Sequence, residues 1–429
     1  MRVVFYSYGT RGDAQPQVVL ASQLRDRGHQ VRVAAPENLR GFVESSGLEY
    51  APLHGNSQAI MESEEGRRWL SSGDVIAFMK ALGKILGEIN PEVFRTAAAA
   101  AEGADAIVGG TLSEDLAYTL AQKRDVPFLL AHTIPYERTG AWPSPLVTTA
   151  RIPLAFVNRL TYSLFRKLAW DVNRGTLNPY RQSLGLAPLA TTVVAGAHEH
   201  GAPVLQLWSE QVLPRPADAA PNITSTGYIR MPPALRERMG EATAPGGLVD
   251  WLERGPAPVY VGFGSMPVLD PLAMAKEVIA VAEALDLRVV LSAGWTNLGE
   301  VEALSGERVY LVRGVDHSWL LPRCVAAVHH GGAGTTAASL EAGVPTVVCS
   351  VFADQPFWGE RVSRLGVGAH VPFPRLDRRT LTAALRACLQ DDVRQRAADL
   401  GAKLRAEDGA TVTVDAIEAS ILGRGRVAS

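Results

Sequence analysis

The 429-residue chain has few of the features that mark secreted, membrane-spanning or nucleic-acid-binding proteins. Its three cysteines, Cys324, Cys349 and Cys388, are widely spaced and form neither a disulfide framework nor a zinc pattern. No apolar run is long enough to span a bilayer, and the opening MRVVFYSYGTRGD is too short an apolar run for a signal peptide. The net charge is -2 and no block of one sign occurs, so nothing indicates nucleic acid as a partner. We expect a soluble, cytoplasmic protein.

The length favours two domains of roughly 200 residues each. Strand-like and helix-like segments alternate from residues 3–6 onward, and residues 259–265 (VYVGFGS) restart the pattern after a stretch rich in Pro, Gly and Ala. This alternation predicts two doubly wound α/β domains, whose parallel sheets bind ligands at their carboxyl ends. We expect a first domain over residues 1–214, a linker region over 215–258 and a second domain over 259–429.

Aromatic residues and prolines accumulate between residues 134 and 189, Trp142 among them. Such a segment is compatible with a set of packed helices. It is equally compatible with an apolar wall for a small-molecule cleft, and the residues alone do not decide between the two.

The most informative stretch is 328–368, which begins VHHGGAGTT. Three glycines stand at the start of a predicted helix: Gly331, Gly332 and Gly334. Uncovered backbone N–H groups and the helix dipole favour an anion there, and Thr335 and His330 add further donors. A glycine turn can also serve close packing alone. The adjoining histidines and the later Asp354-Gln355 pair favour a phosphate site followed by a reader of a polar group.

These motifs resemble the donor site of the inverting UDP-glycosyltransferase superfamily, which has the GT-B fold. HHGGAGTT, GVP and ADQPFW carry the resemblance in the second half, and GTRGDAQP and RGHQVRVAAPENLRGFVESSGLEY in the first. DHSWLLPR and DQPFWGERV are most similar to the sterol glucosyltransferase-like branch, which neighbours bacterial enzymes of antibiotic and natural-product biosynthesis. The resemblance implies two Rossmann-like domains facing a central cleft, acceptor-binding first and donor-binding second. As is common in such folds, a final helix around residues 411–422 would cross back to the first domain.

The resemblance also implies a role for individual residues. His330 and the glycine turn would hold the diphosphate, and Asp354 and Gln355 would hydrogen-bond the sugar. Trp295 and Val315 would lie near the nucleoside. The full set for the donor is Gly264, Ser265, Trp295, Val315, His330, Gly332, Gly334, Thr335, Asp354 and Gln355.

Two departures from the plant members of the superfamily concern the nucleoside. Those members place a tryptophan near the start of the motif to stack on the base, and no tryptophan stands at the equivalent place near Val312. They also have a glutamate for the ribose hydroxyls, where this chain has Ala338. These departures leave the nucleoside open: the resemblance favours UDP-glucose as the donor, and a dTDP-sugar is the alternative.

Asp13, in the loop after the first strand, is the candidate general base. Transfer with inversion needs a group that takes the proton of the acceptor hydroxyl as its oxygen attacks the anomeric carbon. Desolvation beside a lipophilic acceptor would raise the pKa of this carboxyl towards that task. Asp13 could instead only cap a helix beginning near Pro16, although both roles can coexist.

Other residues have weaker claims to chemistry. Gly12, His132 and Trp142 are candidates for the acceptor side, with a structural role as the alternative for His132. His29 is interpreted as a helix-end residue, and His329 as a packing residue on the strand face opposite His330. His198 and His200 are further acid–base candidates.

No Asp-x-Asp pair occurs in the chain, although transferases that bind the diphosphate through Mg²⁺ or Mn²⁺ normally need one. We expect no metal and no cofactor, with helix dipole, His330 and backbone amides stabilising the leaving group. The partners would be a nucleotide sugar and a lipophilic acceptor. Two alternatives remain: a nucleotide-sugar epimerase on the same fold, and a non-catalytic partner of another transferase. The oligomeric state is open.

Overall fold

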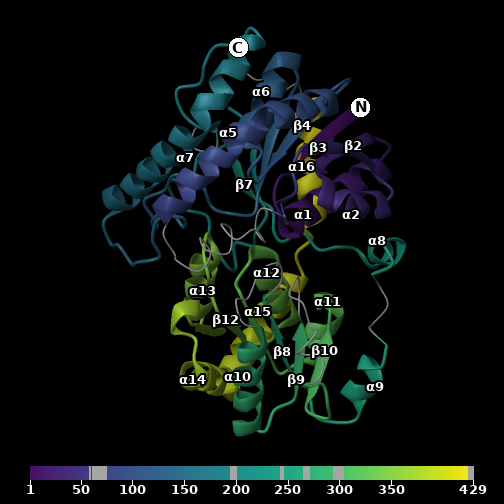
Figure 1. Cartoon of the computed structure of the whole chain (residues 1–429), viewed down its shortest axis with the longest axis vertical. Helices are drawn as coiled ribbons and strands as arrows, with labels where there is room; N and C mark the ends of the chain where they lie inside the picture. Colours follow the sequence, from purple (N-terminus) through teal and green to yellow (C-terminus); the bar gives the residue numbers. More distant parts are fainter. Residues whose placement is uncertain are drawn as a thin grey trace. The chain divides into compact units, whose positions relative to one another are not determined.

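The computed structural model describes residues 1–57, 59, 75–193, 201–241, 246–263, 271–292 and 304–423. The chain divides into two compact units. Unit 1 contains the described residues up to Met239 and again from Asp408, and unit 2 contains those from Gly240 to Glu407. Each unit is a parallel sheet with helices on both faces (Figure 1).

Unit 1 is built on a seven-stranded parallel sheet of order β3-β2-β1-β4-β5-β6-β7. Its strands are β1 (Arg2–Tyr6), β2 (Gln30–Pro36), β3 (Glu49–Leu53), β4 (Ala106–Gly110), β5 (Phe128–His132), β6 (Val204–Gln206) and β7 (Ile223–Ser225). Its helices are α1 (Arg11–Asp26), α2 (Arg40–Ser45), α5 (Val75–Ala100), α6 (Glu114–Arg124), α7 (Ala155–Ser183), α8 (Pro233–Arg238) and α16 (Gly409–Leu422).

The alternation of side chains along β1 separates two cores in unit 1. Val3 and Phe5 face α1, α2 and α16, whereas Val4 and Tyr6 face α5 and α6. All four side chains are fully buried, as expected for a central parallel strand covered on both faces.

Unit 2 is built on a six-stranded parallel sheet of order β10-β9-β8-β11-β12-β13. Its strands are β8 (Val259–Gly262), β9 (Val289–Ser292), β10 (Val309–Val312), β11 (Ala326–His329), β12 (Thr346–Val348) and β13 (Gly368–His370). Its helices are α9 (Leu248–Glu253), α10 (Pro271–Ala284), α11 (His317–Leu320), α12 (Ala333–Ala342), α13 (Gln355–Arg364), α14 (Arg378–Cys388) and α15 (Asp391–Arg405).

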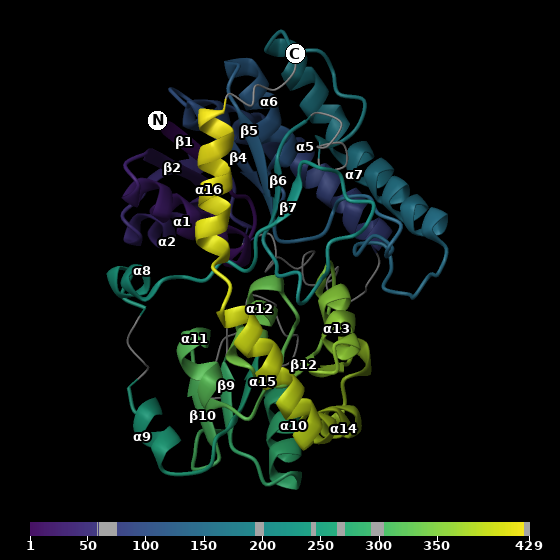
Figure 2. The same cartoon turned by 180° about the vertical axis from the view of Figure 1, so that it is seen from behind.

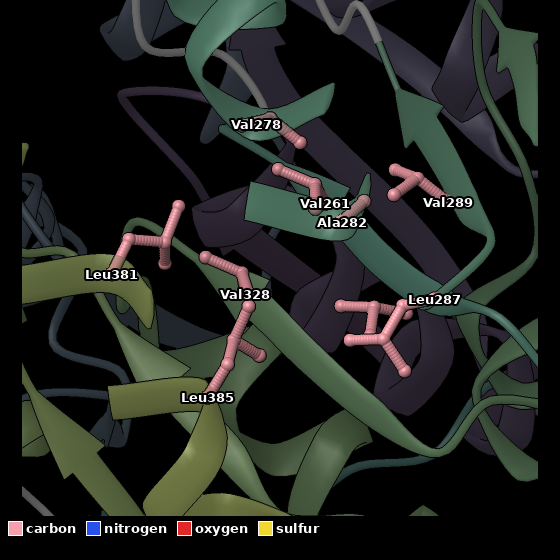
Figure 3. Close-up of a pocket in the computed structure, with 9 residues that line it drawn as sticks. Val261, Val278, Ala282, Leu287, Val289, Val328, Leu381 and Leu385 are labelled. Atoms are coloured by element: carbon pink, nitrogen blue, oxygen red, sulfur yellow. The ribbon is translucent and has the colours of Figure 1, made fainter. Parts of the chain in front are cut away.

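A small apolar cavity of about 10 Å³ lies between the sheet of unit 2 and the helices α10 and α14 (Figure 3). Its lining is Val259, Val261, Val278, Ala282, Leu287, Val289, Val328, Leu381 and Leu385. A space of this size without a polar lining group holds no ordered water, so it is a packing defect in the core.

The structure places several boundaries differently from the sequence. The helix α1 begins at Arg11, not near Pro16, because Thr10 and Asp13 form a capping box around its first turn. The stretch 215–258 contains β7 and α8 of unit 1 as well as α9 of unit 2, so the change of unit falls at Met239–Gly240. The aromatic segment contains one long helix, α7, which follows residues without regular structure.

The last helix, α16, belongs to unit 1 and lies along α1 (Figure 2). Val414, Ile417 and Ile421 enter the same core as the inner face of α1. At the surface Arg27 forms ion pairs with Asp415 and Glu418, both at 2.6 Å. The end of the chain thus completes the core of the first unit.

We predict that Ile417→Ala lowers the free energy of unfolding of unit 1 by about 2–5 kcal/mol, because Ile417 is fully buried and its truncation leaves a cavity. Hydrogen exchange of the α1 and β1 amides under increasing urea measures this loss. The matched control is Val412→Ala on the same helix, where the side chain is 46% exposed. Equal effects of the two substitutions would contradict the packing assigned to α16.

Candidate functional site

The turn between β11 and α12 contains His330, Gly331 and Gly332. Gly331 has a φ of +90°, and a Cβ there would lie 2.5 Å from the Val348 Cγ1 and 3.2 Å from the Gln355 carbonyl oxygen. Both the backbone angle and the close approach require glycine. Gly332 precedes α12 with no side-chain cap. The turn therefore presents the bare N-terminus of α12 and lies against the start of α13.

The His330 ring lies over this helix start. A Cβ on Gly332 would be only 2.6 Å from the His330 Nε2. His330 is 9% exposed, and its Nδ1 has no hydrogen-bond partner among the described residues. Burial, helped by the nearby His317, lowers the pKa of His330 to about 4. The ring is thus a neutral imidazole at pH 7, with one N–H to donate to a ligand.

His329 has a structural role, as expected. Its Nδ1 accepts a hydrogen bond from the Gly331 N–H at 3.0 Å, and its Nε2 lies 3.2 Å from the Ser339 Oγ. Because Nδ1 accepts, Nε2 carries the proton and donates to Ser339. Burial lowers the pKa of His329 well below its ordinary value, so the ring stays neutral. These two hydrogen bonds connect the glycine turn to α12 through His329.

Asp354 and Gln355 stand at the start of α13, next to the glycine turn. The Asp354 Oδ2 accepts a hydrogen bond from the Trp358 Nε1 at 2.7 Å. The Gln355 Oε1 accepts from the Val351 N–H at 2.8 Å and the Phe352 N–H at 3.2 Å. Both side chains are buried. Each side chain therefore stabilises its own loop. This loop lies next to the glycine turn, because Gly331 packs against Gln355.

The other residues expected at the donor site are less uniform in their surroundings. Gly334 is exposed and Thr335 half-buried on the first turn of α12, whereas Thr336 is buried and its Oγ1 has no partner among the described residues. Val315 packs against the apolar cluster around Leu320. The remaining three, Gly264, Ser265 and Trp295, lie outside the described residues.

In unit 1, Asp13 is the third residue of α1 and closes its capping box. The Asp13 Oδ2 accepts hydrogen bonds from the Thr10 N–H at 2.8 Å and the Thr10 Oγ at 3.2 Å. Gly9, with a φ of +137°, lies so close that a Cβ would collide with this oxygen. Burial of the carboxyl raises its pKa to about 6, although the Thr10 hydrogen bonds oppose the shift. Asp13 therefore caps α1, and its carboxyl also has a raised pKa of about 6.

The remaining candidates of unit 1 have contacts within that unit. Gly12 is exposed and donates its N–H to the Thr10 Oγ at 3.2 Å. Trp142 is half-buried and lies beside the Tyr162 hydroxyl. The His29 Nε2 is 2.9 Å from the Glu418 Oε1, so His29 connects the turn after α1 to α16. His198 and His200 lie outside the described residues. Within the described part of the chain, no group of three or more His, Cys, Asp or Glu side chains could hold a metal ion.

Comparisons with known proteins match both units. The glycosyltransferase family 28 N-terminal domain matches residues 3–129, and the erythromycin biosynthesis protein CIII-like C-terminal domain matches residues 276–419. Over 417 residues, 95% of each chain, the sequence is 35% identical to O-mycaminosyltylonolide 6-deoxyallosyltransferase of Streptomyces fradiae. The chain belongs to the GT-B glycosyltransferases.

This glycosyltransferase is also similar to sterol 3-beta-glucosyltransferases. Two from Arabidopsis thaliana are 33% and 34% identical over 97% of this chain, which spans 67% and 65% of their lengths. One from Neosartorya fischeri is 32% identical over 97% of this chain, which spans only 29% of it. The family resemblance found in the motifs is thus confirmed, including its sterol and antibiotic branches.

Solved structures confirm the predicted fold. The calicheamicin glycosyltransferase has a TM-score of 0.70 at 18% identity, covering 99% of this chain and 98% of that one. The glycosyltransferase VinC in complex with dTDP has a TM-score of 0.68 at 20% identity, covering 99% and 100%. The two parallel-sheet α/β domains are those of the GT-B fold.

The structure of this glycosyltransferase also shows a buried ionisable cluster that the sequence did not reveal. The His132 Nδ1 is 2.8 Å from the Glu137 Oε1, and the His132 Nε2 is 3.5 Å from the Glu114 Oε1. The Glu137 Oε2 accepts from the Gln206 Nε2 at 2.9 Å. Only His132 was singled out beforehand, because the three ionisable residues lie 5 to 23 positions apart. Their one sequence signal is that Glu114 comes shortly after the buried strand β4 and His132 ends the buried strand β5.

The cluster joins the ends of β4, β5 and β6 at the carboxyl edge of the sheet. Burial raises the pKa of Glu114 to about 7, against the opposing attraction of His132. The pKa of His132 is raised because its two carboxylate neighbours outweigh the effect of burial. Folding therefore favours the protonated form of both groups. The free energy of unfolding consequently falls as the pH rises from the unfolded-state pKa of each group through its raised folded-state pKa.

We predict that the urea midpoint of the wild-type protein decreases between pH 5 and pH 8, and that Glu114→Gln reduces this decrease. A folded pKa raised from 4.5 to about 7 corresponds to about 3 kcal/mol lost as the pH rises. The control is Glu102→Gln at an exposed position. Identical pH slopes for wild type and Glu114→Gln would show that the glutamate is not held protonated by the fold.

Proposed function

We propose that this protein is an inverting O-glycosyltransferase that moves a hexose from a nucleoside-diphosphate sugar to a hydroxyl of a lipophilic polycyclic acceptor. Unit 2 binds the donor, and Asp13 of unit 1 is the general base. The observation that carries the proposal is the neutral, buried His330 over the uncapped N-terminus of α12. It is an anion site of the kind that a diphosphate leaving group requires.

The geometry of the turn supports the proposed binding of the donor. The β-phosphate oxygens would accept hydrogen bonds from the first N–H groups of α12 and from the neutral imidazole of His330. As the C1–O bond breaks, the electron pair passes to the diphosphate, and the helix dipole stabilises the added negative charge. Asp354 and Gln355 would hydrogen-bond the sugar hydroxyls, because their loop is fixed beside the turn.

The acceptor side uses the raised pKa of Asp13. The ionised carboxylate takes the proton of the acceptor hydroxyl while that oxygen bonds to C1 from the face opposite the diphosphate. An α-linked donor thus gives a β-glycoside. A base with a pKa of about 6 is ionised at neutral pH and basic enough to help, which balances the two requirements of general base catalysis.

The names of the relatives support the proposed class of acceptor. Sterol 3-beta-glucosyltransferases and O-mycaminosyltylonolide 6-deoxyallosyltransferase are named for a sterol and for O-mycaminosyltylonolide. We propose a sterol-like or polycyclic natural product as acceptor here, with UDP-glucose favoured and a dTDP-sugar as the alternative donor. No metal enters the proposed reaction, because the N–H groups of α12 and His330 would stabilise the charge of the diphosphate.

The function is tested by measuring nucleoside-diphosphate release and product mass with UDP-glucose and dTDP-glucose, each with a panel of sterols, macrolide aglycones and flavonoids. A mass gain of one hexose on an acceptor, with stoichiometric release of UDP or dTDP, supports the transferase. Conversion of the sugar without an acceptor would indicate an epimerase. Absence of both with every donor and acceptor, while the nucleotide still binds, would indicate a non-catalytic partner.

We predict that Asp13→Asn lowers kcat by about 10²–10⁴-fold, the usual contribution of a general base. The amide oxygen of asparagine can still accept the Thr10 hydrogen bonds, so the helix cap persists. In the wild type, kcat should fall as the pH drops below about 6, because protonation removes the base. Asp26→Asn on the exposed end of the same helix is the control. Undiminished turnover by Asp13→Asn would exclude Asp13 as the base.

A further inference from the structure

The first half of α7 has an apolar outer face. Phe156, Leu160 and Leu164 are 67%, 62% and 48% exposed, and Leu154, just before the helix, is 53% exposed. Residues four apart share one face of a helix, so the three helical side chains form a line. Leu154 is exposed two positions before the first of them. We call these four residues the α7 stripe. In the rest of the described chain the exposed large hydrophobic side chains are far apart in sequence: Met1, Leu112, Val249, Val412 and Leu422.

The opposite face of α7 is firmly packed. Asn158, Tyr162 and Trp170 are buried, and the Asn90 side chain on α5 donates to the Thr176 Oγ at 2.7 Å. The rings of Phe94 and Tyr180 stack at 4.4 Å between the same helices, which lie side by side in Figures 1 and 2. The α7 stripe therefore belongs to a fixed helix. Its exposure is not that of a frayed terminus.

The surroundings of the stripe are cationic. Residues 141–170 contain Arg151, Arg159, Arg166 and Lys167 and neither an aspartate nor a glutamate. Arg151 is exposed and forms no ion pair with a described residue, and the Lys167 side chain is 74% exposed. Two acids from outside the segment offset part of the charge: Asp218 pairs with Arg159, and Asp171 with Lys167. A net positive charge remains around the apolar line.

We propose that the α7 stripe and its flanking cations dock unit 1 on the surface of a bilayer that contains anionic lipids. An amphipathic helix with large apolar side chains on one face and cations beside them binds in the plane of the membrane interface. The apolar side chains enter the acyl boundary, and Arg151 and Lys167 contact the lipid phosphates. The binding is peripheral, since no helix among the described residues is long and apolar enough to cross a membrane.

A second copy of the chain fits this face less well. Two such stripes related by a two-fold axis would bring the cations of both copies together, which costs free energy unless anions intervene. Four partly exposed side chains, three on the helix and one just before it, also provide much less than the roughly 800 Å² per partner of a standard interface. An anionic lipid surface satisfies both the apolar line and the positive charge.

The test is co-sedimentation of the full-length protein with vesicles of phosphatidylcholine alone and with 30% phosphatidylglycerol, without donor or acceptor. We expect binding to the anionic vesicles that is at least ten-fold stronger than to the neutral ones and that weakens in 0.5 M NaCl. Phe156→Ser combined with Leu160→Ser and Leu164→Ser should weaken binding at least ten-fold. Arg151→Gln with Lys167→Gln should weaken it about ten-fold or more, at about 1 kcal/mol for each cation.

Val249→Ser in unit 2 is the matched control, since this apolar side chain is also exposed (42%) but does not belong to the α7 stripe. Circular dichroism melts establish that each variant is folded. Equal binding of the stripe variant and the wild type would overturn the proposal. So would sedimentation of the wild type as a dimer that the stripe variant disperses, with no vesicle binding by either. Vesicle binding is measured without turnover, so this proposal and the proposed transfer fail or succeed separately.

Discussion

A neutral imidazole buried against the open end of a helix is the interaction on which the proposed donor site of this protein depends. His330 stays uncharged because burial lowers its pKa to about 4. Its Nδ1 has no hydrogen-bond partner among the described residues. A buried polar group without a partner costs free energy, and a bound anion would repay that cost. The glycines at 331 and 332 follow from the same constraint. One lets the chain pass α13, and the other leaves room for the ring.

The two units have the same architecture, but the polar groups at the carboxyl edges of their sheets differ. In unit 2, helix dipoles and neutral hydrogen-bond donors at the carboxyl edge of a parallel sheet would stabilise the proposed anion. In unit 1, the corresponding edge holds carboxyl groups whose pKa values burial raises, Asp13 to about 6 and Glu114 to about 7. Asp13 also caps α1, so the residue proposed as base is fixed by the helix that it stabilises. A single carboxylate oxygen serves that cap through both of its Thr10 hydrogen bonds.

Much of this could be predicted from the sequence. Runs such as VVFY and VYVG are long and apolar enough to mark central strands, and the glycine-rich turn before α12 is a strong local signal. The strands β6, β7 and β13 have three residues each, which gives too little periodicity to predict them. The edge strand β3, EYAPL, contains a proline and mixed polarity. The start of α1 was misplaced because Thr10 and Asp13 were not interpreted as a capping box.

The site was predictable to the extent that its residues are neighbours in sequence. His330, the glycine turn and Asp354-Gln355 fall within one stretch, and the structure brings them together. Glu114, His132 and Glu137 come from different elements, and only the sheet places them side by side. The sequence also could not show that one oxygen of Asp354 is bound by Trp358, or that Gln355 holds the loop before it.

The central claim is that the turn and the His330 ring together hold a diphosphate. Gly332→Ala tests it most directly, because the added Cβ would lie 2.6 Å from the His330 Nε2 and must displace the ring. Gly306→Ala, where a Cβ meets nothing within 4 Å, is the matched control in the same unit. Calorimetric titration with UDP and with dTDP should show at least a ten-fold weaker Kd for Gly332→Ala, with Gly306→Ala like the wild type. Unchanged nucleotide binding by a folded Gly332→Ala would contradict the account.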